Sequence, residues 1–192
     1  MCNNDRTAAR ATLAARALLV ATIVLGAGAA GNAAVLEAVK DNDGAGLRGL
    51  LADGADPNEA DSDGTAALHW AVHQGQSETV AALLSAGAAV DAPNRYGVRP
   101  LYLAAENGDA SMVRALLEAG ADPNGARVEG ETALMIAART GDVATLEALI
   151  AAGADVNAVE ERKGQTALMW AAADNNGAAV KALLAAGAAR DA

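Results

Sequence analysis

A short phrase returns at a fixed interval along this chain and constrains its fold more than any other feature. It reads LLSAGAAVDAPN from Leu83, LLEAGADPNGAR from Leu116 and LIAAGADVNAVE from Leu149. Two glycine series follow the same period, with spacings of 33, 33, 33 and 34 residues. They are Gly54, Gly87, Gly120, Gly153 and Gly187, and Gly31, Gly64, Gly97, Gly130 and Gly164. Periods of this length mark stacked repeats. The sequence therefore predicts five units, at about residues 31–61, 62–94, 95–127, 128–161 and 162–192.

Each unit contains two helical patterns. The second pattern places large apolar residues three and four positions apart, as at Val113, Leu116 and Leu117, which gives one stripe on an α-helix. In the first pattern a large apolar residue is followed three positions later by alanine, as at Leu101 and Ala104. Alanine lets packed helices approach closely. A pair this short cannot bury its own stripe, so we predict an all-α solenoid of stacked helix–turn–helix units with short β-turn or hairpin fingers.

The turns and helix starts follow from local chemistry. Between the two helices stand Gly75, Gly108 and Gly141, and the first and last units have Asn42 and Asn175 there. We expect all five to adopt the left-handed conformation, which glycine and asparagine tolerate best. Thr132 and Thr166 are predicted N-caps, whereas Thr65 lies one position earlier. Arg99 followed by Pro100 predicts a weaker cap in the third unit.

Composition excludes several classes of protein. Aromatic residues make up 2% of the chain and phenylalanine is absent, so a deep core of large side chains is not expected. The net charge of −10, without a Lys/Arg cluster, argues against binding nucleic acid. The single cysteine is Cys2, so the repeats contain neither a disulfide nor a thiolate metal site.

The N-terminal segment differs from the rest. Three arginines, Arg6, Arg10 and Arg16, precede the apolar run Ala17–Leu25, and small residues including Ala27 and Ala29 follow. This order predicts a signal peptide over residues 1–30 and a periplasmic or secreted protein of about −12 net charge. The alternative is an uncleaved anchor in the inner membrane, because the apolar tract can be extended to about 20 residues.

The repeated phrases resemble the ankyrin repeat family over residues 31–192. They are GTAALHWAV from Gly64, GVRPLYLAA from Gly97, GETALMIAA from Gly130 and GQTALMWAA from Gly164. The family's histidine is kept at His69 but replaced by Tyr102, Met135 and Met169, and its proline is kept only at Pro100. These departures are expected to weaken the hydrogen-bonded turns usual in the family and to leave the stacking intact.

Chemistry has no visible carrier. His69 and His73 lie four apart, but a third ligand is absent and Trp70 stands between them where a metalloprotease has glutamate. DNDGAG from Asp41 lacks oxygen ligands at Ala45 and Ala52, so it is interpreted as a turn and not a calcium loop. We predict no enzyme activity, metal site or cofactor.

The resemblance implies that partners dock on the fingers and on the concave face of the inner helices. Tyr96 is the candidate contact anchor, Trp70 and Trp170 are interpreted as packing residues, and the fourth finger is the most charged. The finger candidates are Ser62, Asp63, Thr65, Arg95, Tyr96, Val98, Val128, Glu129, Glu131, Glu160, Glu161, Arg162, Lys163 and Gln165. The inner-helix candidates are His73, Gln74, Glu106, Asn107, Arg139, Thr140 and Asp174.

Together these patterns predict a non-catalytic protein–protein interaction scaffold outside the cytoplasm, whose partner carries a basic patch. Two alternatives stay open: a periplasmic stress-protective or metal-buffering protein, and a secreted effector. Contact with a membrane is expected only if the N-terminal segment is uncleaved. The last unit has few polar residues on its outer face, which predicts either self-association or fraying of that end.

Overall fold

The computed structural model describes residues 34–190, so the predicted signal peptide lies outside the described residues. These residues form ten α-helices in five consecutive pairs. The pairs are α2 (Ala34–Lys40) with α3 (Gly44–Ala52), α4 (Ala67–His73) with α5 (Ser77–Ser85), α6 (Pro100–Glu106) with α7 (Ala110–Glu118), α8 (Ala133–Thr140) with α9 (Val143–Ala151), and α10 (Ala167–Ala173) with α11 (Gly177–Ala185). None of these helices is long and apolar enough to span a bilayer.

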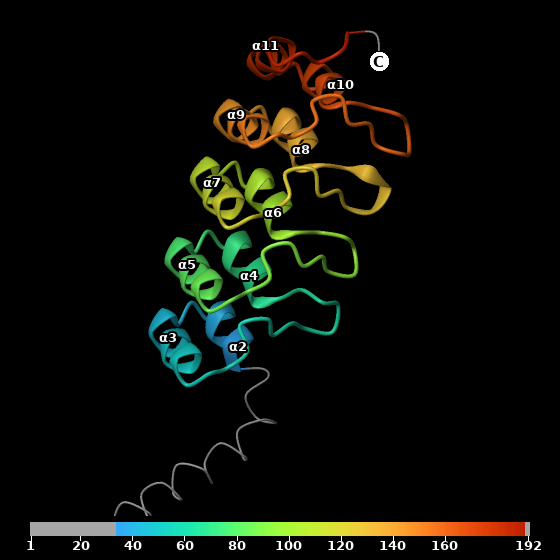
Figure 1. Ribbon diagram of the computed structural model, residues 1–192. Helices are drawn as coiled ribbons and strands as arrows, with labels where there is room; N and C mark the ends of the chain where they lie inside the picture. Colours follow the sequence, from blue (N-terminus) through green and yellow to red (C-terminus); the bar gives the residue numbers. More distant parts are fainter. Residues whose placement is uncertain (1–33, 191–192) are drawn as a thin grey trace, which may run out of the picture.

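The pairs stack in chain order into a solenoid (Figure 1). Helices α2, α4, α6, α8 and α10 form an inner row, α3, α5, α7, α9 and α11 form an outer row, and each inner helix packs on the next inner helix. The connections between pairs extend to one side as fingers (Figure 1). The predicted all-α solenoid of five stacked pairs is confirmed.

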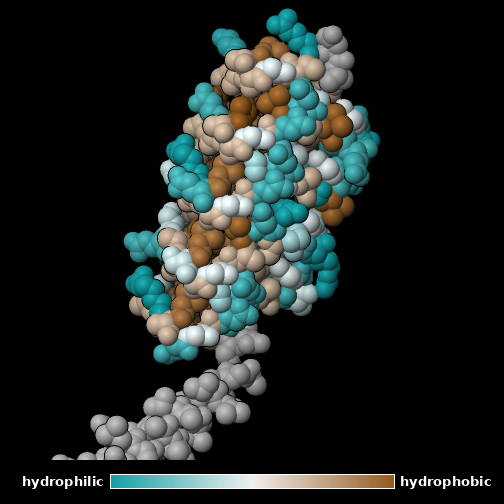
Figure 2. All heavy atoms as spheres, viewed as in Figure 1, coloured by the Kyte–Doolittle hydropathy of each residue, from teal (hydrophilic) through white to brown (hydrophobic). Residues whose placement is uncertain are grey.

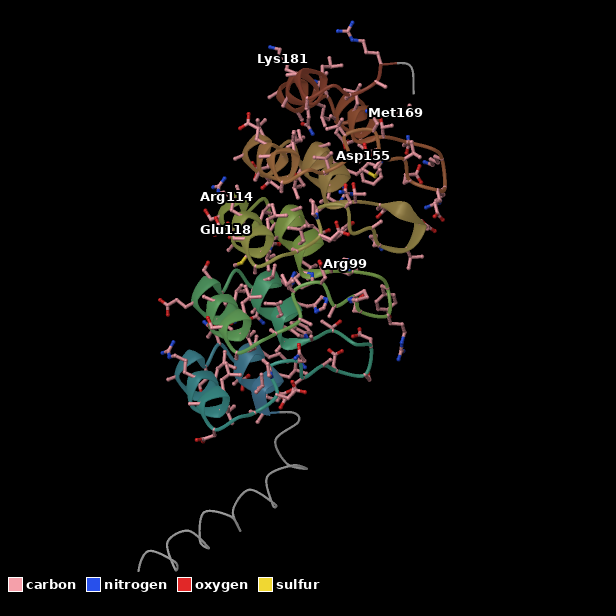
Figure 3. The ribbon with its side chains drawn as sticks, in the orientation of Figure 1. Arg99, Arg114, Glu118, Asp155, Met169 and Lys181 are labelled. Atoms are coloured by element: carbon pink, nitrogen blue, oxygen red, sulfur yellow. The ribbon has the colours of Figure 1, made fainter. Side chains whose placement is uncertain are left out.

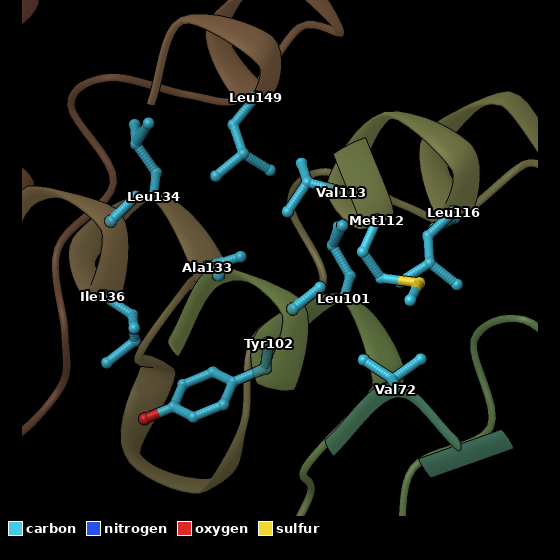
Figure 4. Close-up of a cluster of buried hydrophobic side chains, with 14 of the residues drawn as sticks. Val72, Leu101, Tyr102, Met112, Val113, Leu116, Ala133, Leu134, Ile136 and Leu149 are labelled. Atoms are coloured by element: carbon cyan, nitrogen blue, oxygen red, sulfur yellow. The ribbon is translucent and has the colours of Figure 1, made fainter. Parts of the chain in front are cut away.

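The core runs through the stack without interruption. Leu83, Leu116 and Leu149 of the outer row are each fully buried, and side chains of successive pairs share one cluster (Figure 4). On the inner row the predicted small residues Ala71, Ala104, Ala137 and Ala171 are also fully buried. Because the alanine side chain ends at Cβ, neighbouring inner helices meet closely there, and burial is distributed over many small contacts.

The turns between paired helices have the expected backbone. Gly75 has φ +69° and Gly141 has φ +77°, and the two asparagines that replace glycine, Asn42 and Asn175, both have φ +57°. Asparagine tolerates this left-handed region better than other residues with a Cβ atom, so the first and last turns keep the same geometry without glycine.

The helix starts also agree with the sequence. Thr132 accepts a hydrogen bond from the Met135 N–H and Thr166 accepts one from the Met169 N–H, whereas Arg99 gives α6 no side-chain cap. The sequence did not predict the cap of α2, where Glu59 accepts hydrogen bonds from the N–H groups of Val35 at 2.9 Å and Leu36 at 3.1 Å. This buried carboxylate comes from the following turn and fastens the first helix to it.

The last helix pair is less completely buried than the pairs in the middle of the stack. Leu134 and Met135 of α8 are at most 1% exposed, but their counterparts in α10, Leu168 and Met169, are partly exposed. Apolar side chains of α10 are therefore less covered than those of α8. Self-association through this end stays a prediction.

Candidate protein-interaction surface

The candidate contact residues occupy the fingers and the exposed ends of the inner helices. Tyr96 and Val128, on neighbouring fingers, are 57% and 61% exposed, which is unusual for large apolar side chains. Charged side chains of the outer helices, such as Arg114, Glu118 and Lys181, point away from the stack on the opposite side (Figure 3). Figure 2 shows mostly hydrophilic residues over the viewed parts of the turns and fingers. Exposed apolar area on the fingers is thus set in a polar surround.

Hydrogen bonds between neighbours hold the fingers in place. The Arg95 N–H donates to the Asp63 carbonyl at 2.8 Å, and the Glu161 N–H donates to the Glu129 carbonyl at 2.8 Å. The Arg95 guanidinium also donates to the Ser62 carbonyl at 2.7 Å. Because these hydrogen bonds join the second finger to the first and the fourth finger to the third, contact residues at the tips have little freedom to lose on binding.

Most of the other candidates are accessible. The exposed ones are Ser62, His73, Gln74, Arg95, Glu106, Asn107, Glu129, Arg139, Thr140, Glu161, Arg162, Lys163 and Asp174, and the half-buried ones are Asp63, Thr65, Val98, Glu131 and Gln165. Some of these candidate residues also form hydrogen bonds that hold the fold together. The Asn107 side-chain amide donates to the carbonyls of Val72 and His73, which lie at the end of the preceding inner helix.

The prediction for Glu160 is wrong. The sequence analysis placed this residue among the contact residues on the charged tip of the fourth finger. Its side chain is only 4% exposed and accepts hydrogen bonds from the N–H groups of Arg162, Lys163 and Gln165. Burial acts to raise the pKa of Glu160, but these hydrogen bonds outweigh it and lower the pKa below its ordinary value. Glu160 shapes the finger from within, and Glu161, Arg162 and Lys163 form its exposed charge.

The first complete finger carries a carboxylate that stays charged. Contact with the carboxyl group of Asp61, together with hydrogen bonds from Thr65, lowers the pKa of Asp63 to about 2. The Thr65 N–H donates to both carboxylates, at 3.1 Å for Asp61 and 2.9 Å for Asp63. Asp63 is ionised at neutral pH, as an aspartate of ordinary pKa also is, and the lowered pKa keeps it charged further into the acid range.

Trp70 and Trp170 lie between neighbouring pairs, which confirms their interpretation as packing residues. A cation from the preceding inner helix lies over each ring, Lys40 at 5.3 Å from the Trp70 centroid and Arg139 at 5.8 Å from the Trp170 centroid. Both tryptophans also pack against the hydrophobic core. Cation–π contacts of this kind add to the inter-pair packing, so part of Arg139, a candidate contact residue, is engaged within the chain.

The position of the family's histidine holds three residue types in this chain, and each type makes different contacts. The Ala66 N–H donates to His69 Nδ1 at 3.2 Å, which makes Nε2 the protonated nitrogen that donates to the Val98 carbonyl at 3.0 Å. This links the second pair to the next finger. At the same position Met135 and Met169 make no such link, and the threonine caps before them satisfy the first turn of the helix.

Tyr102, also at the histidine position, contradicts the expectation of a weakened network. The Arg127 guanidinium donates to the Tyr102 hydroxyl at 3.1 Å and to the Glu131 carboxylate at 3.1 Å. Burial raises the pKa of Tyr102, against the opposing effect of the Arg127 hydrogen bond and charge. The tyrosine thus exchanges the histidine link for a charged one that joins its helix to the following finger.

The lowered pKa of His69 predicts that the stability of the protein depends on pH. Burial lowers the pKa of His69 below 6.5, although hydrogen bonds to backbone carbonyls and the charges of Asp61 and Asp63 act in the opposite direction. The unfolded chain therefore binds the proton first as pH falls. The free energy of unfolding should decrease as pH drops below about 6.5 and level off below the folded-state pKa.

The variant His69→Met tests this, because methionine is the natural residue at the same position in the fourth and fifth pairs. Urea denaturation of both proteins from about pH 7.5 to pH 5 should show a steeper loss of stability in the wild type. Superimposable pH dependences would contradict the neutral, hydrogen-bonded state of His69.

The sequence analysis did not predict one series of hydrogen bonds that joins successive units. Asn58 accepts a hydrogen bond from the Ala89 N–H, Asp91 from the Asp122 N–H, and Asn124 from the Asp155 N–H, at 2.7–2.9 Å. Asn157 continues it to Ala189 at 2.8 Å. The signal was present, because these residues stand 33 positions apart with the same side-chain length. When each unit is considered alone, these asparagine and aspartate residues are simply typical of turns.

The structure does not bring the two histidines together as a metal site. Both ring nitrogens of His69 are used in the network above, while His73 is exposed at the end of α4. Within residues 34–190 no three His, Cys, Asp or Glu side chains are grouped so that they could hold a metal ion.

Comparisons with known proteins give one family. The family described as ankyrin repeats (3 copies) matches residues 35–127 and again residues 124–191. A search of curated proteins finds no match to the chain. The two family matches span all five helix pairs. The chain belongs to the ankyrin repeat family.

Proposed function

We propose that this protein is a non-catalytic scaffold that binds another protein outside the cytoplasm through its fingers and inner helices. Ankyrin repeats imply a protein-interaction scaffold and the family is generally non-catalytic. The observation that carries the choice of face is the pair of exposed apolar residues, Tyr96 and Val128, on fingers fixed by backbone hydrogen bonds.

Tyr96 is the proposed anchor. A tyrosine brings a large contact area with few rotatable bonds, and such residues dominate binding energy at interfaces. The Tyr96 N–H donates to the Asn94 side chain at 3.0 Å, so the backbone beneath the ring is held in place. An anchor on a fixed backbone loses little entropy on binding.

The charge supports a basic partner. The chain carries −10, and on the fingers Asp63 stays ionised at neutral pH. Complementary charge speeds encounter and selects among partners more than it adds affinity. The location outside the cytoplasm is supported by the pattern of positive, apolar and small residues in the first thirty positions.

Affinity capture tests the binding face. The chain is used as bait in a periplasmic extract, beside the variants Tyr96→Ala and Arg114→Ala. A protein captured by the wild type should bind Tyr96→Ala about tenfold or more weakly, because truncating an interface anchor costs roughly 2 kcal/mol or more. Arg114→Ala, on the outer row, should bind normally. A partner indifferent both to Tyr96→Ala and to charge reversal at Arg162 would contradict the proposed face.

Location is tested separately by the mass of the chain recovered from cells. Cleavage near Ala29 or Ala30 and recovery in the periplasm support the proposed compartment. Recovery in the culture medium favours the alternative of a secreted effector. An intact N-terminus recovered in the cytoplasmic fraction would exclude both.

A further inference from the structure

A hollow of about 270 Å³ lies on the inner face between the second and third pairs. Its walls are formed by Trp70 and His73 of α4, Leu103 of α6, and Val98 of the intervening finger. Trp70, Leu103 and Val98 are partly exposed apolar residues that pack on the core, and His73 is exposed at the rim. Aromatic and aliphatic walls around a small concavity are the surroundings of interface hot spots.

Most of the buried polar groups beside the hollow are paired within the chain; Trp70 Nε1 has no hydrogen-bond partner among the described residues. The Asn94 amide donates to Thr65 Oγ1 at 3.2 Å, and its oxygen accepts from the N–H groups of Tyr96 and Val98 at 3.0 Å. Both ring nitrogens of His69, at the floor, are used as described above. An occupant therefore finds mostly apolar contacts in the interior.

The volume of the hollow further limits what can bind in it. Pockets for small molecules and cofactors usually measure about 300–1,000 Å³ and offer several convergent polar groups. This hollow is smaller and lacks those groups, so it suits one bulky side chain. The next step of the stack differs, because Ile136, at the position of Leu103, is only 1% exposed.

Carboxylates stand close in sequence or contact to two of the lining residues, Thr65 and Leu103. Asp61 and Asp63 hold the Thr65 N–H on the finger side, and Glu106 stands exposed one helical turn beyond Leu103. Lys40 is already placed over the Trp70 ring. A cation next to an inserted apolar side chain would therefore be attracted by the carboxylates of Asp63 and Glu106.

We propose that this hollow receives one leucine or phenylalanine side chain from a partner segment that carries lysine or arginine within two residues of it. The inference rests on the proposed scaffold function and adds the chemistry of the recognised segment. Apolar insertion supplies most of the affinity, and the flanking cations fix the orientation.

The chain's two tryptophans provide the readout. In Trp170→Phe, Trp70 in the wall of the hollow is the only remaining tryptophan. Its emission is followed during titration with a synthetic peptide of about nine residues that has Lys-Leu-Lys at its centre. We expect a saturable change. Replacing the leucine by alanine should weaken binding about tenfold or more, and replacing both lysines by glutamate should also weaken it.

Two variants locate the response. Trp70→Phe keeps Trp170 as the reporter in a repeat outside the hollow, and its emission should not change. Glu106→Lys alters an exposed residue, so folding should be retained while the preference between lysine and glutamate peptides shifts toward glutamate. No saturable response at millimolar peptide, equal binding of the leucine and alanine peptides, or a response from Trp170 would each overturn the inference.

Failure here is distinguishable from failure of the scaffold function. The variant Leu103→Asp places a charge in the wall of the hollow, and circular dichroism checks that the helices are retained. A captured partner that is lost by Tyr96→Ala but kept by Leu103→Asp would leave the scaffold function standing and reject the hollow as its docking point. Loss of the partner in folded Leu103→Asp supports the inference.

Discussion

Replacing Leu116 by alanine should lower the free energy of unfolding by about 2–5 kcal/mol, the cost of a buried leucine-to-alanine change. Leu116 is fully buried on α7 in the middle pair, and it lies in the cluster that links successive pairs (Figure 4). The surrounding helices are held by neighbours on both sides and can collapse only partly into the cavity. Urea or guanidinium denaturation followed by circular dichroism measures the loss.

Leu183→Ala is the matched comparison at the end of the stack. We expect a smaller effect because the last pair has a neighbouring pair on one side only within the described residues. Burial alone does not give that difference, since Leu183 is as fully buried as Leu116. The smaller effect on the rest of the protein should come from local unfolding of the last pair, which is coupled to the fourth pair on one side only within the described residues. Equal denaturation midpoints for the two variants would contradict this view of the stack.

Gly97→Ala should destabilise the protein more than Gly164→Ala, although both glycines occupy the same position of their fingers. Both have positive φ, +73° and +66°, so alanine at either site costs roughly 1–2 kcal/mol of backbone strain. At Gly97 a Cβ atom would also lie 2.8 Å from the Val128 backbone nitrogen, whereas at Gly164 it meets no atom within 4 Å. The backbone of the third finger must move to admit the new methyl group.

The comparison separates strain from contact between fingers. Thermal or urea unfolding of the two variants gives the difference, and the excess cost at Gly97 reports how firmly the second and third fingers are packed. If Gly164→Ala is as destabilising as Gly97→Ala, the close approach of these fingers does not contribute to stability.

Local chemistry made much of the fold predictable. The period gave the number of pairs, and the spacing of leucine and valine gave the buried side of the outer helices. Asn42 and Asn175 were placed correctly because the left-handed turn depends on one residue's own backbone. Thr132 and Thr166 cap their helices because an N-cap needs a partner only three residues away.

What the sequence alone determined about this protein is therefore its repeat, its paired helices, its turn conformations and its family resemblance. Only the tertiary structure decided which side chains are free. Glu160 turned inward, Glu59 capped a helix 24 residues earlier, and Tyr102 found Arg127 on the next finger. The partners of Glu59 and Tyr102 lie 24 and 25 residues away along the chain, so their distances depend on how the helices and fingers pack, whereas Glu160 forms its hydrogen bonds within its own finger. The sequence pattern fixes each unit's hydrogen bonds within a few residues, whereas the contacts across the stack, including the hollow beside Trp70, arise only after the units have met.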